Sequence, residues 1–254
     1  MKFNQIAQYR FPNGHYIKVE SNHDVWVIGD VHGCAREFEN LCTRIHNLNP
    51  HAIIIQLGDL IDRGPYLKEV FDVVDKHQVI CTIGNHELNF ILEHEQYKRC
   101  GSMARKENHQ RLAAYQSTNI QNRVLTAMKR MYNYVIVDIA DDIENERWFL
   151  SHAPIRGYEQ AWPEQGITAK NGWTYCARTD PYDESYFHAL DRAAHGHQHW
   201  NYIDINQQLN QMFNGDRRVL NVDGGCVYGG ELVAANLLTH ETIRIQPYET
   251  YFTE

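Results

Sequence analysis

Six short polar clusters follow apolar runs in this chain, and their residue types could hold metal ions. They occupy residues 29–33, 58–64, 84–87, 151–153, 196–197 and 223–225. The clusters supply Asp, His and Asn side chains, and the sequence contains no Cys-x-x-Cys pair. This donor set suits borderline divalent ions such as manganese, iron or zinc better than a thiolate site. A metal site is therefore the first chemical hypothesis.

The second and third clusters contain the residues that phosphoryl transfer needs. Two metal ions about 3.5 to 4 Å apart can generate a hydroxide nucleophile and clamp the oxygens of a phosphoryl group. Asp59 is the natural bridge between two such ions, and Asn85 offers a neutral carbonyl oxygen. His86, oriented by a carboxylate such as Asp62, could act as a general acid toward a leaving alkoxide. Arg63 could bind phosphate oxygens in bidentate fashion.

The apolar runs before the clusters predict buried strands over residues 25–28, 52–57, 79–83 and 148–150. Apolar residues recur at helical spacing after the first two clusters, at Phe38, Leu41, Cys42 and Ile45 and at Leu67, Val70, Phe71 and Val74. The clusters are 26 to 29 residues apart, from Asp30 to Asp59 to Asn85, close to the roughly 30 of a βαβ unit. Parallel strands then place these side chains along one edge of a sheet.

Three motifs in the first half of the chain resemble a known family. Asp-x-His-Gly, Gly-Asp-x-x-Asp-Arg-Gly and Gly-Asn-His-Glu, in this order and at this spacing, resemble the phosphoprotein-phosphatase branch of the calcineurin-like metallophosphoesterases. Residues 29–34 and 221–230 are most similar to the bacterial and bacteriophage lambda serine/threonine protein phosphatases of that branch. The resemblance spans roughly residues 24–240. It implies an α/β fold in which two central β-sheets pack as a sandwich flanked by helices, with a helical insertion.

The same resemblance implies a set of site residues. One metal ion would be held by Asp30, His32 and Asp59, and the other by Asp59, Asn85, His152 and His197. His86 would be the acid and Asp62 its partner. The cofactors would be two divalent metal ions, manganese first, with iron or zinc as alternatives. His197 is assigned by its place after Gly196, with His195 beside the ligands and His199 at the substrate rim.

The resemblance also implies a second phosphate-binding arginine, between the clusters at residues 151–153 and 196–197. Arg178 in the stretch Trp-Thr-Tyr-Cys-Ala-Arg is the choice, and Arg156 is the rival. Because an Arg beside an Asp is as often a surface pair, the functional and structural interpretations of Arg178 both stay open.

A single metallophosphoesterase domain is expected over residues 1–254. It divides into a first βαβ metal-binding half at 24–87, a helical insertion at 88–147 and a second half at 148–254. Residues 218–222, 232–238 and 242–245 are expected to be antiparallel strands of a second sheet. The insertion is either a packing subdomain or a cap that selects substrates.

The composition and net charge of the chain limit the classes of partner that it is expected to bind. The chain has 254 residues, of which 43% are hydrophobic and 22% charged, as in an ordinary globular protein. A net charge of −8 disfavours extended nucleic-acid binding. No membrane partner is expected, because no stretch approaches the roughly 18 apolar residues of a span. Six scattered cysteines fit reduced thiols and a cytoplasmic protein.

The predicted function is that of a dinuclear-metal phosphomonoesterase, in which phosphoserine or phosphothreonine of a protein is the favoured substrate. Phosphorylated small molecules are the wider substrate class. The first alternative is a symmetrical dinucleoside tetraphosphate hydrolase, because that related family has the same motifs and Gly-Gly-Cys-Val-Tyr-Gly-Gly ending. Further alternatives are a phosphatase or phosphodiesterase for nucleic-acid ends, and a catalytically idle binding module. Metal-dependent turnover of p-nitrophenyl phosphate would exclude the idle module.

Overall fold

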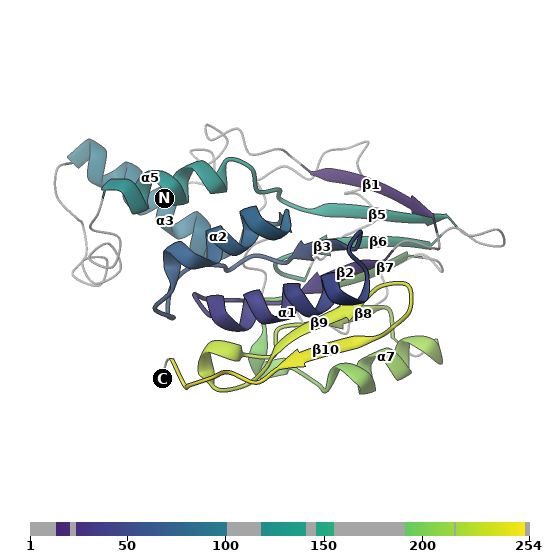
Figure 1. The fold of residues 1–254 in the computed structure, drawn as a ribbon. Helices are drawn as coiled ribbons and strands as arrows, with labels where there is room; N and C mark the ends of the chain where they lie inside the picture. The colour runs from purple at the N-terminus through teal and green to yellow at the C-terminus, as the bar shows by residue number, and fades with distance from the viewer. Residues whose placement is uncertain are drawn as a thin grey trace.

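The computed structural model describes residues 14–20, 24–100, 118–140, 146–154, 191–215 and 217–251. Two five-stranded β-sheets pack against each other in these residues, with helices beside them (Figure 1). The predicted fold class is therefore confirmed. No helix in the described ranges is both long and apolar enough to cross a bilayer. Arg156 and Arg178, the two candidates for the second phosphate-binding arginine, lie outside the described residues.

The first sheet has the strand order β10-β9-β2-β3-β4. Its strands are β2 (Val25–Ile28), β3 (Ile53–Gln56), β4 (Ile80–Cys81), β9 (Leu232–Asn236) and β10 (Thr242–Ile245). β2, β3 and β4 are parallel neighbours, and they are joined through α1 (Ala35–Leu48) and α2 (Leu67–His77). The predicted strand–helix–strand arrangement is present.

The second sheet has the order β1-β5-β6-β7-β8. Its strands are β1 (His15–Glu20), β5 (Val135–Ala140), β6 (Glu146–Ser151), β7 (Asp191–His195) and β8 (Val219–Asn221). β6, β7 and β8 are parallel, whereas β5 is antiparallel to β6.

Two features of the sheets correct the sequence predictions. The segments expected as antiparallel strands of the second sheet divide: β9 and β10 join the first sheet beside β2, and β8 runs parallel to β7 in the second. The interval expected as a helical insertion contains α3 (Asn85–Cys100) and α5 (Thr118–Met128), but also the strand β5. An apolar pattern predicts that a segment has a buried face, whereas the choice of neighbouring strand depends on contacts far along the chain.

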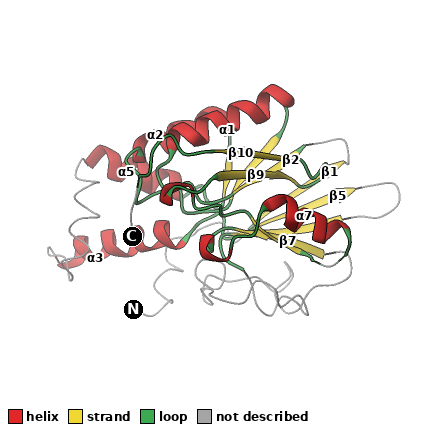
Figure 2. Ribbon diagram, turned by 90° about the horizontal axis from the view of Figure 1, so that it is seen from below, coloured by secondary structure: helices red, strands yellow, loops and turns green. Residues whose placement is uncertain are grey.

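Successive side chains of β2 point to opposite faces of the sheet and pack into two different hydrophobic cores. Trp26 and Ile28 belong to the core that also contains the buried faces of α1 and α2, while Val25 and Val27 belong to the core between the sheets. Helix α7 (Ile205–Phe213) adds apolar side chains to the second core. In Figure 2, α1 and α2 lie on one side of the strands. Both faces of β2 are thus buried in a core, which makes the first sheet a rigid support for the loops at its edge.

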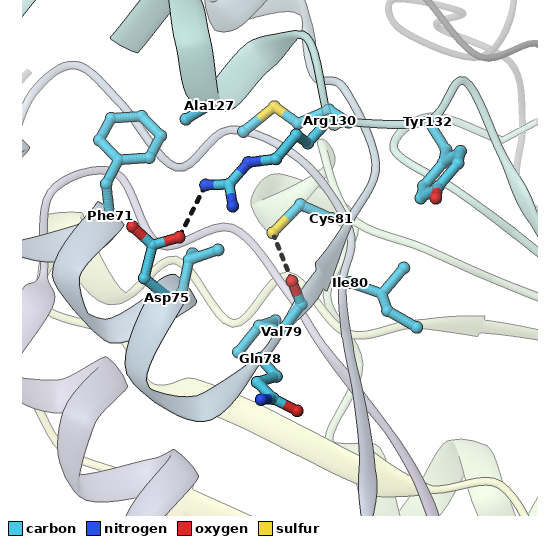
Figure 3. Close-up of a pocket in the computed structure, with 11 residues that line it drawn as sticks. Phe71, Asp75, Gln78, Val79, Ile80, Cys81, Ala127, Arg130 and Tyr132 are labelled. Carbon is cyan, nitrogen blue, oxygen red and sulfur yellow. Dashed lines mark hydrogen bonds and ion pairs between the residues drawn. The ribbon is translucent and has the colours of Figure 1, made fainter. Parts of the chain in front are cut away.

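A cavity of about 410 Å³ lies among α2, β4 and the end of α5 (Figure 3). Its lining is partly apolar, with Phe71 and Met131, and Arg130 Nη2 pairs there with Asp75 Oδ1 at 2.7 Å. None of the lining residues is a predicted site residue. The cavity is therefore separate from the predicted metal site.

Candidate metal centre

The predicted ligands lie at the carboxyl ends of five strands, and Asp223, which was not predicted as a ligand, lies at the end of a sixth. Because β2, β3 and β4 are parallel to one another and β6, β7 and β8 likewise, the loops after them can meet at one edge of the sandwich. The residues at these ends are Asp30 after β2, Asp59 after β3, Asn85 after β4, His152 after β6, His197 after β7 and Asp223 after β8.

Asp59 belongs to two groups of ligand atoms in the described part of the chain. His32 and His86 complete one group, and His152 and His197 complete the other. Within each group the atoms lie within 4.8 Å of one another. Asp59 Oδ2 is 3.6 Å from His32 Nε2 and 3.4 Å from His152 Nε2. A carboxylate with imidazoles on both sides is the arrangement that two bridged divalent ions require.

Backbone carbonyls orient the rings of His32 and His152. His32 Nδ1 donates to the carbonyl oxygen of Ile61 at 2.9 Å, and His152 Nδ1 donates to that of Leu57 at 2.8 Å. Each ring therefore turns its Nε2 toward Asp59, as metal-binding histidines do when their other nitrogen is held. Asn85 Oδ1 lies 2.9 Å from His152 Nε2, so the predicted neutral ligand is also in place.

Asp30 connects the two groups. Its Oδ2 is 3.8 Å from His32 Nε2 and its Oδ1 is 3.8 Å from His152 Nδ1. Oδ1 also accepts a hydrogen bond from the backbone N–H of His197 at 3.0 Å. Burial and the nearby Asp223 carboxylate raise the pKa of Asp30 well above its usual value. Asp223, to which the sequence analysis gave no role, thus adds to the negative charge of the centre.

The buried carboxylates of Asp30 and Asp59 favour a positive charge between them and His152. Burial lowers the pKa of His152, but the carboxylates of Asp59 and Asp30 outweigh that effect and raise it to about 10. A divalent cation would satisfy the same field and relieve the cost of burying several carboxylates together. The donor types, the ring orientations and the charge all fit a dinuclear centre.

His197, rather than His195, belongs to a ligand group. His197 forms a ligand group with Asp59 and His152, whereas a buried Nε2 atom without a hydrogen-bond partner among the described residues is common to His197 and His195. His195 is the last residue of β7, and its Nδ1 donates to the carbonyl oxygen of Gly196 at 2.8 Å. It is in neither ligand group of the described residues. The structure thus places His195 beside the centre.

His86 and Asp62 form a buried pair. His86 Nδ1 lies 2.6 Å from Asp62 Oδ2, and His86 Nε2 lies 3.8 Å from Asp59 Oδ2. The carboxylate of Asp62 therefore holds the ring so that Nε2 faces the ligand groups. From this position Nε2 can give a proton to a leaving oxygen, although the same position also makes it a candidate ligand.

Arg63 lies at the same edge. Its Nη1 contacts Nε2 of His32, and its guanidinium carbon is 5.2 Å from the centroid of the Tyr228 ring. The side chain is half-buried. The predicted phosphate-binding arginine is therefore within reach of a group bound at the centre.

The backbone of the site is unusual at His32, Asp59, Asp62, Arg63 and His197. Their φ angles lie between +47° and +69°, a region that costs roughly 1–2 kcal/mol for each side-chain-bearing residue. Such strain is typical of functional sites, where the surrounding structure imposes it. The spacing of the motifs in the sequence did not predict these positive φ angles.

Glycine is required at two of the predicted motifs because carboxylate oxygens approach the backbone closely. A Cβ atom on Gly84 would collide with Asp59 Oδ1, and one on Gly196 would collide with Asp30 Oδ1. These contacts explain why Gly precedes Asn85 and His197 in the sequence.

Glu87 has a role that sequence reasoning missed. Its buried carboxylate accepts hydrogen bonds from the backbone N–H groups of Asp59 at 2.9 Å, Gly84 at 2.8 Å, Leu60 at 2.8 Å and Ile61 at 3.2 Å. It thereby ties the loop after β3 to the loop after β4. The available signal was a Glu three residues after Gly84 at the start of α3, as in a capping box.

Replacing Glu87 with Gln is expected to lower the free energy of unfolding by about 2–4 kcal/mol, because a single amide oxygen cannot satisfy four buried donors. Urea denaturation of the metal-free protein would measure it. Burial and the Asp59 carboxylate raise the pKa of Glu87 to about 7. The measurement should therefore be made at about pH 8, where the Glu87 carboxylate is ionised.

The matched control is Glu39→Gln. Glu39 is 35% exposed and pairs with Lys76 at the surface, so its loss should cost less than about 1 kcal/mol. Equal stability of Glu87→Gln and the wild type would refute the tying role of Glu87.

The chain is similar to known phosphoesterases. A family model described as calcineurin-like phosphoesterase matches residues 23–201. Serine/threonine-protein phosphatase 2 of Escherichia coli is 36% identical over 81 residues, which are 30% of this chain and 36% of that protein. A symmetrical bis(5'-nucleosyl)-tetraphosphatase of Nitrosococcus oceani is 23% identical over 270 residues, covering 84% of this chain and 92% of that protein.

Solved structures share the fold. The crystal structure of a candidate diadenosine tetraphosphatase superposes with a TM-score of 0.60 at 17% sequence identity, covering 92% of this chain and 98% of that one. At this identity the similarity is one of fold.

Proposed function

Because this chain belongs to the calcineurin-like phosphoesterase family, whose members are metal-dependent phosphatases, we propose that it hydrolyses phosphate bonds at the centre built around Asp59. The observation that carries the proposal is the pair of ligand groups that share Asp59; one of them includes His86, whose Nδ1 is paired with Asp62. The proposed cofactors are two divalent metal ions, manganese first, with iron or zinc as alternatives. Their proposed ligands are Asp30, His32, Asp59, Asn85, His152 and His197.

The ions, when bound, would activate water and polarise the phosphoryl oxygens. Arg63 would bind the phosphate through its guanidinium, which is planar and suited to two oxygens at once. His86 would give the proton on Nε2 to the leaving oxygen, while Asp62 keeps the ring in place through Nδ1. Arg178 stays the proposed second phosphate ligand.

Phosphoserine and phosphothreonine of proteins are the first candidate substrates, supported by the motifs and by the local similarity to the E. coli phosphatase. Symmetrical dinucleoside tetraphosphates are the second candidate. A specific observation favours them: the N. oceani relative is similar along 84% of this chain and not only at the motifs. We propose a cytoplasmic location, because Cys34, Cys42, Cys81 and Cys226 are buried free thiols.

Removal of metal is expected to abolish turnover. Dialysis against EDTA should lower kcat/KM by about 10³-fold or more for every substrate, and manganese, iron or zinc should restore it. Steady-state assays with a phosphoserine peptide, a phosphotyrosine peptide, diadenosine tetraphosphate and a 5′-phosphorylated oligonucleotide would then assign the substrate by kcat/KM. Turnover that survives EDTA, or no turnover with any of the three metals, would overturn the proposed function.

A further inference from the structure

Trp200 is an exposed aromatic side chain next to the metal centre. Five large hydrophobic side chains are exposed in the described part of the chain: Tyr16, Leu48, Trp200, Phe213 and Tyr248. Trp200 is 53% exposed, and its ring lies 5.9 Å from that of His197, at an interplanar angle of 72°. His197 belongs to the second ligand group. A single exposed aromatic residue is common, but one that contacts a candidate metal ligand has a specific location.

Trp200 is one end of a continuous row of rings. Its ring is 5.2 Å from that of His199, and His199 stacks on Tyr228 with centroids 4.4 Å apart and planes 25° apart. The guanidinium of Arg63 lies over the other member of that stack, Tyr228. The aromatic row, defined as Trp200, His199 and Tyr228, therefore runs from the proposed phosphate-binding arginine to a proposed metal ligand.

The turns that carry the row are held by the fold. The backbone carbonyl of Gln198 accepts a hydrogen bond from Asn221 Nδ2 at 2.9 Å, which joins the start of the row to the end of β8. A Cβ atom on Gly225 would approach the Cβ atom of His199 to 3.2 Å, so this glycine lets the two turns pack closely. An aromatic surface on such a support loses little freedom when a ligand stacks on it.

We propose that Trp200 is a stacking platform for the nucleobase of a nucleoside phosphate whose phosphate group binds at the metal centre. The inference rests on the proposed function, and of its two candidate substrate classes it favours the dinucleoside tetraphosphates over phosphoproteins. A nucleobase is a rigid planar ring system joined to its phosphate through the ribose, and it can stack on a half-exposed indole ring. A phosphoserine side chain carries no planar group to fill this surface, so the row would have no part in binding it.

Binding of three small phosphates tests the proposal directly. The affinity of the manganese-loaded protein is measured by isothermal titration calorimetry for adenosine 5′-monophosphate, ribose 5-phosphate and inorganic phosphate. The differences among the three affinities give the separate contributions of the base, the sugar and the phosphate. We expect the wild type to bind the monophosphate about 5- to 100-fold more tightly than ribose 5-phosphate, the range of one base–aromatic stack. Trp200→Ala should remove this preference, and Trp200→Phe should keep most of it.

The matched control is Phe213→Ala. Phe213 is 77% exposed at the end of α7 and its ring contacts that of His240, so its loss should leave the preference for the base unchanged. Equal affinity of the wild type for the two sugar phosphates would overturn the platform, as would a preference that survives Trp200→Ala. So would an equal loss of affinity for all three phosphates in that variant, since Trp200 would then support the centre itself.

Two further outcomes separate this inference from the proposed function. If a phosphoserine peptide binds through Trp200 and the nucleotide does not, the platform proposal is wrong while the phosphatase proposal stands. If the base preference is present and lost in Trp200→Ala, but no phosphate substrate is turned over with any metal, the platform is supported and the proposed function fails.

Discussion

Replacing Asp59 with Asn is expected to remove both proposed metal ions and the turnover that depends on them. Asp59 contributes to both ligand groups, and its Oδ2 lies within 4 Å of Nε2 of His32 and of His152. An amide keeps the shape but lacks the charge that bridges two cations. We expect kcat/KM to fall by about 10³-fold or more, and bound metal measured by mass spectrometry to fall with it.

The matched control is Asp62→Asn, because Asp62 lies on the same loop after β3 as Asp59. Asp62 is buried like Asp59, yet it pairs with His86 Nδ1 rather than joining a ligand group. This variant should keep its metal. Manganese should raise the Tm of the wild type and of Asp62→Asn but not of Asp59→Asn, because a ligand that binds only the folded state stabilises it. Full metal occupancy in Asp59→Asn would exclude the bridging role.

Replacing His86 with Asn is expected to lower kcat for phosphoserine by about 10²- to 10⁴-fold, the usual range for a lost general acid. The Nε2 atom faces the centre and Asp62 holds the opposite nitrogen, so the substitution removes a positioned proton donor. An activated aryl phosphate needs little protonation of its leaving group. The loss with p-nitrophenyl phosphate should therefore be much smaller, and this difference distinguishes an acid from a residue that only shapes the site.

Metal content decides between the two roles that the geometry allows for His86. Because its Nε2 atom also belongs to the first ligand group, loss of bound metal in His86→Asn would identify it as a ligand and reject the acid assignment. His77→Asn is the matched control: His77 is buried and pairs with a carboxylate, Glu39, at 3.2 Å, but lies on α2 outside both ligand groups. It should keep both metal content and turnover.

The local pattern of the sequence predicts that three of the candidate ligands lie close together, whereas His152 and His197 were proposed as ligands from the family resemblance. Asp30, Asp59 and Asn85 each follow a glycine at the end of an apolar run, and parallel strands joined by helices place consecutive strand ends at one edge. The structure brings these residues together with His152 and His197 at that edge. The same local pattern predicted the three parallel strands of the first sheet and the two helices that join them.

Other features depend on which distant segments meet, and no local pattern contains that information. Val233 and Ala235 lie in the core between the sheets, in the strand that pairs with β2, although the continuous apolar run that contains them suits either sheet. The four bonds of Glu87 require two loops to lie side by side, and the row that ends at Trp200 requires the turns after β7 and β8 to pack together. Residue types and their order along the chain predicted the proposed metal chemistry, whereas the packing of the loops determined what supports the candidate ligands and what borders them.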